Sequence, residues 1–61
     1  MLDEMDLAII RELIKDGRAS YRSIAKKLGI SVATVASRVA ALEKDGIIKG
    51  YAALVDYEKL G

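Results

Sequence analysis

Residues Ser20–Gly46 read SYRSIAKKLGISVATVASRVAALEKDG, and they determine how the rest of this chain is arranged. The stretch contains a short helical pattern and a longer one, joined at Gly29. A glycine there can adopt the left-handed conformation that ends a helix and redirects the chain. Ser31 is a good N-cap, so the second helix is predicted to begin at Val32. Two helices joined by a tight glycine turn are typical of a helix-turn-helix.

The second of these helices is predicted to have one apolar side and one side of small and polar residues. At helical spacing, its apolar side consists of Val32, Val35, Ala36, Val39 and Leu42. The other side consists of Ala33, Thr34, Ser37, Ala41 and Lys44. The shorter helix has a narrower apolar stripe, formed by Ile24, Ala25 and Leu28. In a helix-turn-helix, the outer side of the second helix is the surface that a major groove would meet.

Positive charge is concentrated around these two helices. Residues 17–50 include seven Lys and Arg against two Asp and Glu, a net charge of +5, whereas residues 1–16 have a net charge of −3. Pairs of amphipathic helices joined by a glycine also occur in proteins that never bind nucleic acid. The concentration of charge favours DNA, because neutralising phosphates is the main source of affinity for a duplex.

Length and composition restrict the classes of protein to consider. The chain has 61 residues, enough for one domain with a small core, and an apolar content of 52% argues against disorder. It has no Cys and no His, so we expect no disulfide, no metal site and no cofactor. No apolar run approaches the roughly 20 residues of a transmembrane helix, and we expect no signal peptide. These features predict a cytoplasmic protein without a membrane partner.

The first sixteen residues predict a supporting helix. Asp3 is a good N-cap, and Asp6 can complete a capping box with it. Leu2 and Leu7 stand at the positions of a hydrophobic staple. The apolar face that follows consists of Ile9, Ile10, Leu13 and Ile14. We expect this helix to end near Gly17 and to cover the helix-turn-helix from behind, with its acidic residues keeping that side away from DNA.

After Gly46 the pattern changes from helical to strand-like. Ile47-Ile48 and Tyr51–Val55 are β-branched, aromatic and aliphatic, with Lys49-Gly50 as a turn between them. This fits a short hairpin, the wing of a winged helix, and equally one extended strand that needs a partner. Because the strand is apolar on both faces, we expect it to pair in a homodimer. The residues of this predicted dimer strand are Tyr51, Ala53, Leu54 and Val55.

Five motifs distributed over the chain are distinctive in combination. They are LDEMD (2–6), DGRAS (16–20), IAKKLGIS (24–31), VASRV (35–39) and LEKDGIIKGY (42–51). Together they resemble the amino-terminal domain of the Lrp/AsnC transcription regulators, also called feast/famine regulatory proteins. The resemblance implies a mainly α, three-helix winged helix-turn-helix over residues 1–50. It also implies a strand or hinge over residues 51–61 that leads to a second domain.

In that family the third helix enters the major groove and the second domain, a larger αβ domain, binds an amino-acid effector and drives assembly. An effector is therefore implied only if a second domain follows residue 61. The resemblance also supports the homodimer, since the strand after the helix-turn-helix is similar in position to one that pairs across the dimer.

The docking of a helix-turn-helix on duplex DNA assigns candidate contacts. The candidates for base edges are Ser31, Ala33, Thr34, Ser37 and Arg38. The candidates for phosphates are Arg18, Ser20, Tyr21, Arg22, Lys26, Lys44 and Lys49. Arg38 lies at the flank of the apolar side, so a phosphate or intramolecular contact is an alternative for it. Asn and Gln are missing from the outer face, and we expect much of the specificity to come from DNA shape and from paired half-sites.

Two other classes of function are alternatives to DNA binding. A protein-interaction module whose basic surface binds an acidic partner is the main alternative, and salt dependence on unrelated duplexes distinguishes it from a DNA-binding domain. An enzyme is disfavoured, because neither His nor Cys is available for acid–base or nucleophilic chemistry. Asp3 and Asp6 are explained better as helix caps than as a catalytic pair.

Overall fold

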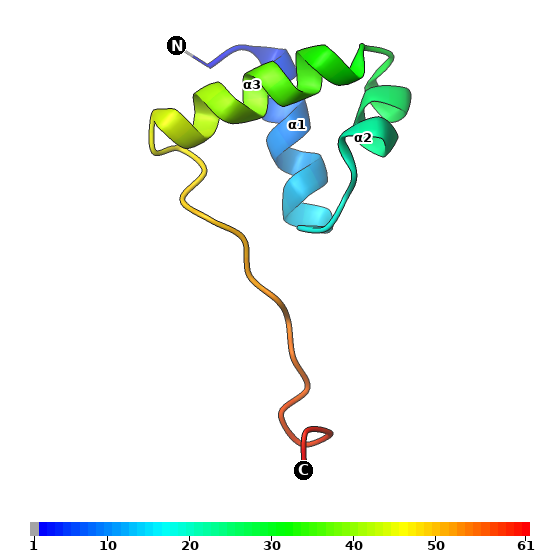
Figure 1. The fold of residues 1–61 in the computed structure, drawn as a ribbon, viewed down its shortest axis with the longest axis vertical. Helices are drawn as coiled ribbons and strands as arrows, with labels where there is room; N and C mark the ends of the chain where they lie inside the picture. Colours follow the sequence, from blue (N-terminus) through cyan, green and yellow to red (C-terminus); the bar gives the residue numbers. More distant parts are fainter. Residues whose placement is uncertain (1) are drawn as a thin grey trace.

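A computed structural model of the chain describes residues 2–61, and three helices form its folded part (Figure 1). α1 spans Glu4–Lys15, α2 spans Tyr21–Leu28 and α3 spans Val32–Lys44. Each helix packs against the other two, and α3 lies across α1 (Figure 1). The predicted mainly α architecture with three helices is thus confirmed. Within residues 2–61, no helix has the length and apolar character that a membrane crossing requires.

A capping box sets the start of α1, as predicted. The Oδ1 atom of Asp3 accepts the backbone N–H of Asp6 at 2.9 Å, and the Oδ2 atom of Asp6 accepts the N–H of Asp3 at 3.2 Å. At the other end Asp16 caps the helix, and its carboxylate accepts the N–H of Arg18 at 2.9 Å. Gly17 is not among the glycines with positive φ, so this turn does not depend on its conformational freedom.

The turn between α2 and α3 forms by the predicted mechanism. Gly29 has a φ of 71°, and the N–H of Ile30 donates to the carbonyl of Ala25 at 3.0 Å, which closes the end of α2. The Oγ atom of Ser31 then accepts the N–H of Thr34 at 3.0 Å and caps α3. Because the chain leaves one helix and begins the next within so few residues, α3 has a fixed direction relative to α2.

The core lies where the three helices meet. Its buried side chains are Ile9, Ile24, Ala25, Val35 and Val39, and Leu42 is buried as well. Each large apolar side chain buried in this way contributes about 1.5–3 kcal/mol to folding. Two residues predicted to lie on apolar faces are instead exposed, Ile14 by 78% and Val32 by 45%. Val32 is the first residue of α3, and Ile14 belongs to the end of α1 that extends beyond α3 (Figure 1).

After α3 the chain turns at Gly46, which has a φ of 74°, and runs away from the helices (Figure 1). Residues 2–61 contain no strand, and the predicted hairpin does not form. One reason is local: the N–H groups of Ile47 and Ile48 both donate to the carbonyl of Leu42, at 3.0 and 3.1 Å, and so are not free to pair in a hairpin. The other reason is that extended residues such as Tyr51–Val55 need a neighbouring strand, which the single chain does not provide.

The carboxy-terminal residues form a short turn. The Oδ1 atom of Asp56 accepts the N–H groups of Glu58 and Lys59, at 3.1 and 3.2 Å. Side chains before and within this turn remain open to solvent, including Leu54, Tyr57 and Leu60. The folded core therefore ends with Ile48, which packs against it.

Candidate nucleic-acid interface

The outer face of α3 is open and made of small side chains. Ala33, Ser37 and Ala41 are exposed, and they lie one above another because they are spaced by four residues. Small side chains in such a row let a helix approach base pairs closely, and the alanine methyl groups can contact thymine methyls. The shape of this face fits a major groove.

Two further base-edge candidates bond to each other at the start of α3. The hydroxyl oxygens of Ser31 and Thr34 lie 2.8 Å apart, and Ser31 also caps the helix. A hydroxyl has one donor and two acceptor positions, so each retains capacity for a further partner. The structure therefore places both residues beside the open face with defined orientations.

The last base-edge candidate, Arg38, is engaged within the molecule. Its Nη1 atom lies 2.7 Å from both carboxylate oxygens of Asp3 and 3.2 Å from Oδ1 of Asp6. The hydrogen bond from Arg38 lowers the pKa of Asp3, and the bonds to the two carboxylates raise the pKa of Arg38. This is the intramolecular contact that the sequence offered as an alternative. A base-edge role for Arg38 stays a prediction.

The positive charges of residues 17–50 differ in their availability. Arg38 is paired with Asp3 and Asp6, and the Nζ atom of Lys27 lies 3.0 Å from Oε1 of Glu12. The other five cations are exposed and have no carboxylate partner within residues 2–61: Arg18, Arg22, Lys26, Lys44 and Lys49. These five are the charged residues predicted to contact phosphates.

The amino terminus of α2 offers donors next to two of these cations. Ser20 caps the helix by accepting the N–H of Ser23 at 3.0 Å. The N–H groups of the first two helical residues, Tyr21 and Arg22, have no acceptor in the described part of the chain. Free N–H groups at a helix start attract phosphate, and the side chains of Arg22 and Lys26 lie one turn apart on the same helix.

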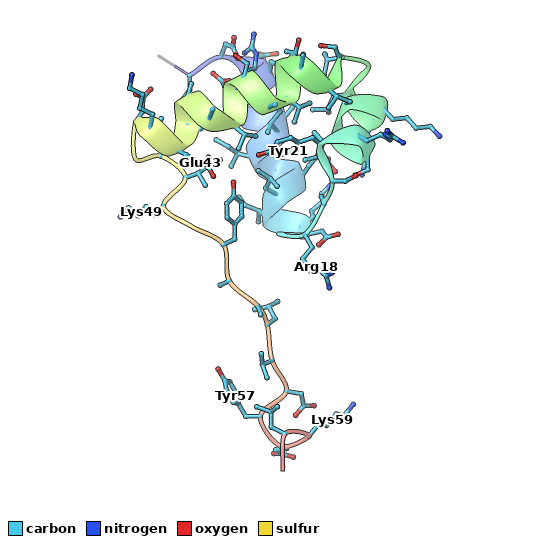
Figure 2. All side chains as sticks on the ribbon, viewed as in Figure 1. Arg18, Tyr21, Glu43, Lys49, Tyr57 and Lys59 are labelled. Atoms are coloured by element: carbon cyan, nitrogen blue, oxygen red, sulfur yellow. The ribbon has the colours of Figure 1, made fainter. Side chains whose placement is uncertain are left out.

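The remaining phosphate candidates are spread over the surface. Arg18 lies at the turn after α1, whereas Lys49 lies at the start of the departing segment (Figure 2). Tyr21 is half-exposed at the start of α2; the pKa of Tyr51 is raised by desolvation and by its hydrogen bond to Glu43, and Tyr21 adds a smaller effect. The structure thus gathers Ser20, Arg22 and Lys26 on one helix but does not bring all seven candidates together.

Sequence reasoning missed three acidic or aromatic contacts around this surface. The sequence predicts Asp3 and Asp6 only as caps, yet they also hold Arg38. The hydroxyl of Tyr51 donates to Oε2 of Glu43 at 3.0 Å, a contact for which no sequence pattern gave a signal. For Arg38, its position at the flank of α3 was the one available indication.

Comparison with known proteins agrees with this geometry. The family described as winged helix-turn-helix DNA-binding matches residues 2–49. The HTH-type transcriptional regulator LrpA of Pyrococcus horikoshii is 51% identical over 61 residues, which is 100% of this chain and 43% of that protein. The HTH-type transcriptional regulator LrpC of Bacillus subtilis is 50% identical over 60 residues, which is 98% of this chain and 42% of that protein.

Solved structures give the same result. Bacillus subtilis LrpC superposes with a TM-score of 0.88 at 49% identity, covering 100% of this chain and 44% of that chain. Escherichia coli AsnC superposes with a TM-score of 0.84 at 33% identity, covering 100% of this chain and 41% of that chain. The chain therefore spans less than half the length of the relatives that it matches.

Proposed function

The chain belongs to the winged helix-turn-helix DNA-binding domains of the Lrp/AsnC transcription regulators, a family of regulators and not of enzymes, and we propose that it binds duplex DNA with α3 in the major groove. The observation that carries this docking is the open row of Ala33, Ser37 and Ala41 on α3. No larger side chain stands in that row to hold the helix away from base edges.

We divide the proposed contacts into those that specify sequence and those that position the protein. Ala33 and Ser37 read base edges, together with Ser31 and Thr34 at the start of α3. The phosphate contacts come first from the amino terminus of α2, through Ser20, Arg22 and Lys26. The remaining positioning contacts are Arg18, Tyr21, Lys44 and Lys49.

We propose that residues 51–61 connect residues 1–50 to a second domain, since the relatives are more than twice as long as this chain. Residues 51–55 would then become a strand by pairing with the same residues of a second copy. This proposal is supported by the exposure of all five residues, of which Leu54 is completely exposed. A homodimer of this kind places two copies of α3 in successive major-groove faces, about one helical turn apart.

For the longer protein we propose regulation of transcription in the cytoplasm. Sequence discrimination by one copy would be modest, because the row on α3 has no Asn, Gln or free Arg side chain to form bidentate bonds with bases. Paired half-sites and sequence-dependent DNA shape would supply the rest. An amino-acid effector belongs to this proposal only through the second domain.

Salt dependence of DNA binding tests the proposed function. With about four phosphate contacts per copy, the slope of log K against log salt should be near −4, on specific and unrelated duplexes alike. Fluorescence anisotropy with labelled duplexes at several salt concentrations measures this slope. A slope near zero would contradict duplex binding and favour a protein-interaction module, for which an acidic protein partner would then be required.

A further inference from the structure

The Arg38 cluster, defined as Asp3, Asp6 and Arg38, connects the start of α1 to α3. Asp3 caps α1 with the same carboxylate that accepts two contacts of 2.7 Å from Nη1 of Arg38. Asp6 adds a third oxygen at 3.2 Å, and its side chain is only 15% exposed. The guanidinium is therefore held from α1, although its helix is α3.

This cluster borders the proposed DNA-reading face. Arg38 follows the exposed Ser37 directly in α3 and lies one turn before Ala41. All three line one shallow groove together with Asp6. A released Arg38 would stand beside the open row with its charge free for a phosphate or a guanine.

The charge of the cluster is what sets its effect on DNA. Two carboxylates and one guanidinium leave a net charge of −1 beside the middle of α3. A net negative site repels the duplex backbone, whereas a free arginine would add a phosphate contact that is independent of sequence.

We propose that Asp3 and Asp6 are specificity-determining residues that withhold Arg38 from DNA. By holding the guanidinium, they reduce sequence-independent binding and leave discrimination to the small residues of α3 and to DNA shape. This inference rests on the proposed function, because it concerns the same DNA-binding face. Asp3 and Asp6 would act on specificity through Arg38 and not by contact with DNA.

The variant Asp3→Asn tests the proposal with little risk to folding, because Asn is also a good N-cap. The matched control is Glu4→Gln, which removes the same charge from the first turn of α1, where Glu4 is exposed and has no ion-pair partner within residues 2–61. A second control, Asp3→Asn with Arg38→Gln, restores the net charge of the parent cluster. Circular dichroism confirms that each variant is folded.

The readout is the salt slope of binding to a random-sequence duplex, which a purely structural role of Asp3 would not change. For Asp3→Asn the slope should become steeper by about 1, so its affinity relative to the parent should change roughly three- to fourfold between about 50 and 200 mM salt. Glu4→Gln and the double variant should keep the slope of the parent. The proposal is overturned if Asp3→Asn keeps the parent slope, or if Glu4→Gln changes it as much. A parent chain that fails to bind would instead contradict the proposed function.

Discussion

The hydroxyl of Tyr51 donates a 3.0 Å hydrogen bond to Oε2 of Glu43, and this bond ties the segment after α3 to the last turn of that helix. Partial desolvation of the half-exposed Tyr51 side chain and its bond to Glu43 both raise the pKa of the phenol. No strand pairs with the segment within residues 2–61, so this side-chain contact is one of its few attachments to the helices. Tyr51 therefore attaches the start of this segment to α3.

Removing that hydroxyl should cost a small, measurable amount of stability. Tyr51→Phe is expected to lower the free energy of unfolding by about 0.5–1 kcal/mol, since the hydrogen bond is partly exposed. Tyr57→Phe is the matched control, because Tyr57 is 77% exposed and its hydroxyl has no partner within the described residues. Urea unfolding followed by circular dichroism measures both. Equal effects of the two variants would show that the bond to Glu43 contributes nothing.

The Ser31 cap of α3 should contribute more to the free energy of unfolding than an exposed hydroxyl on the same helix. Ser31→Ala removes the acceptor for the N–H of Thr34, and we expect a loss of about 1 kcal/mol. Ser37→Ala removes an exposed hydroxyl for which the described part of the chain shows no hydrogen bond, so its effect should stay within about 0.5 kcal/mol. Thermal unfolding of the three proteins compares them. A Ser31→Ala variant as stable as Ser37→Ala would contradict the capping role.

The pairing of Asp3 with Arg38 should make stability depend on pH in the acid range. The folded pKa of Asp3 lies below its ordinary value of 3.8, chiefly because Arg38 donates a hydrogen bond to it. A lowered pKa stabilises the fold where Asp3 is ionised, so the contribution is present above about pH 4 and is lost as pH falls through the folded value. The parent should melt at a higher temperature than Asp3→Asn. We expect this difference in melting temperature to shrink below about pH 4.

The same comparison in an Arg38→Gln background provides the control for this pH effect. Without the guanidinium, the difference between Asp3 and Asn should vary less with pH, because the main cause of the lowered pKa is gone. An unchanged pH dependence in that background would assign the effect to another group.

Local signals explain which parts of the fold were predictable. The capping box at Asp3, the turn at Gly29 and the cap at Ser31 each depend on residues within a few positions, and all three form as predicted. The contact between Asp3 and Arg38 joins residues 35 positions apart, and no spacing rule identifies such a pair. Sequence reasoning could therefore place Arg38 at the flank of a helix but could not choose its partner.

The incorrect predictions have other causes. Ile14 and Val32 have the right periodicity for a core, but three short helices do not cover every apolar position of one another. The hairpin failed because closing α3 uses the N–H groups of Ile47 and Ile48. For Tyr51–Val55 the predicted strand needs a neighbouring strand, and residues 2–61 form none. Candidate DNA contacts remain predictions, since their assignment depends on how a duplex docks.

Positioning and specifying contacts should respond differently to mutation. Arg22→Ala is expected to weaken binding to all duplexes alike and to reduce the salt slope by about 1, because it removes a phosphate contact. Ser37→Arg places a long donor on the open face of α3 and should change the preferred sequence, with discrimination of about 1–3 kcal/mol at the base it contacts. Selection from randomised duplexes, followed by affinity measurements, tests both. If Arg22→Ala altered the preference and Ser37→Arg did not, the proposed docking of α3 would be wrong.

The proposed dimer strand explains an otherwise unfavourable surface. Leu54 is completely exposed and Val55 is 42% exposed, next to a groove that Ile14 also lines. Unpaired backbone groups on an exposed apolar segment favour pairing with another chain. Pairing with the same strand of a second copy would satisfy those groups and bury part of the apolar surface in one interface with two-fold symmetry.

A charge within this strand should therefore separate the two copies. Leu54→Lys is expected to shift the chain to monomer and to weaken binding to a duplex with two half-sites far more than to one with a single half-site. Leu60→Lys is the control, because Leu60 is 71% exposed but lies outside the strand. Sedimentation equilibrium at micromolar to millimolar concentration measures the association. A parent that stays monomeric throughout, or a Leu54→Lys variant that dimerises like the parent, would rule out this strand as the interface.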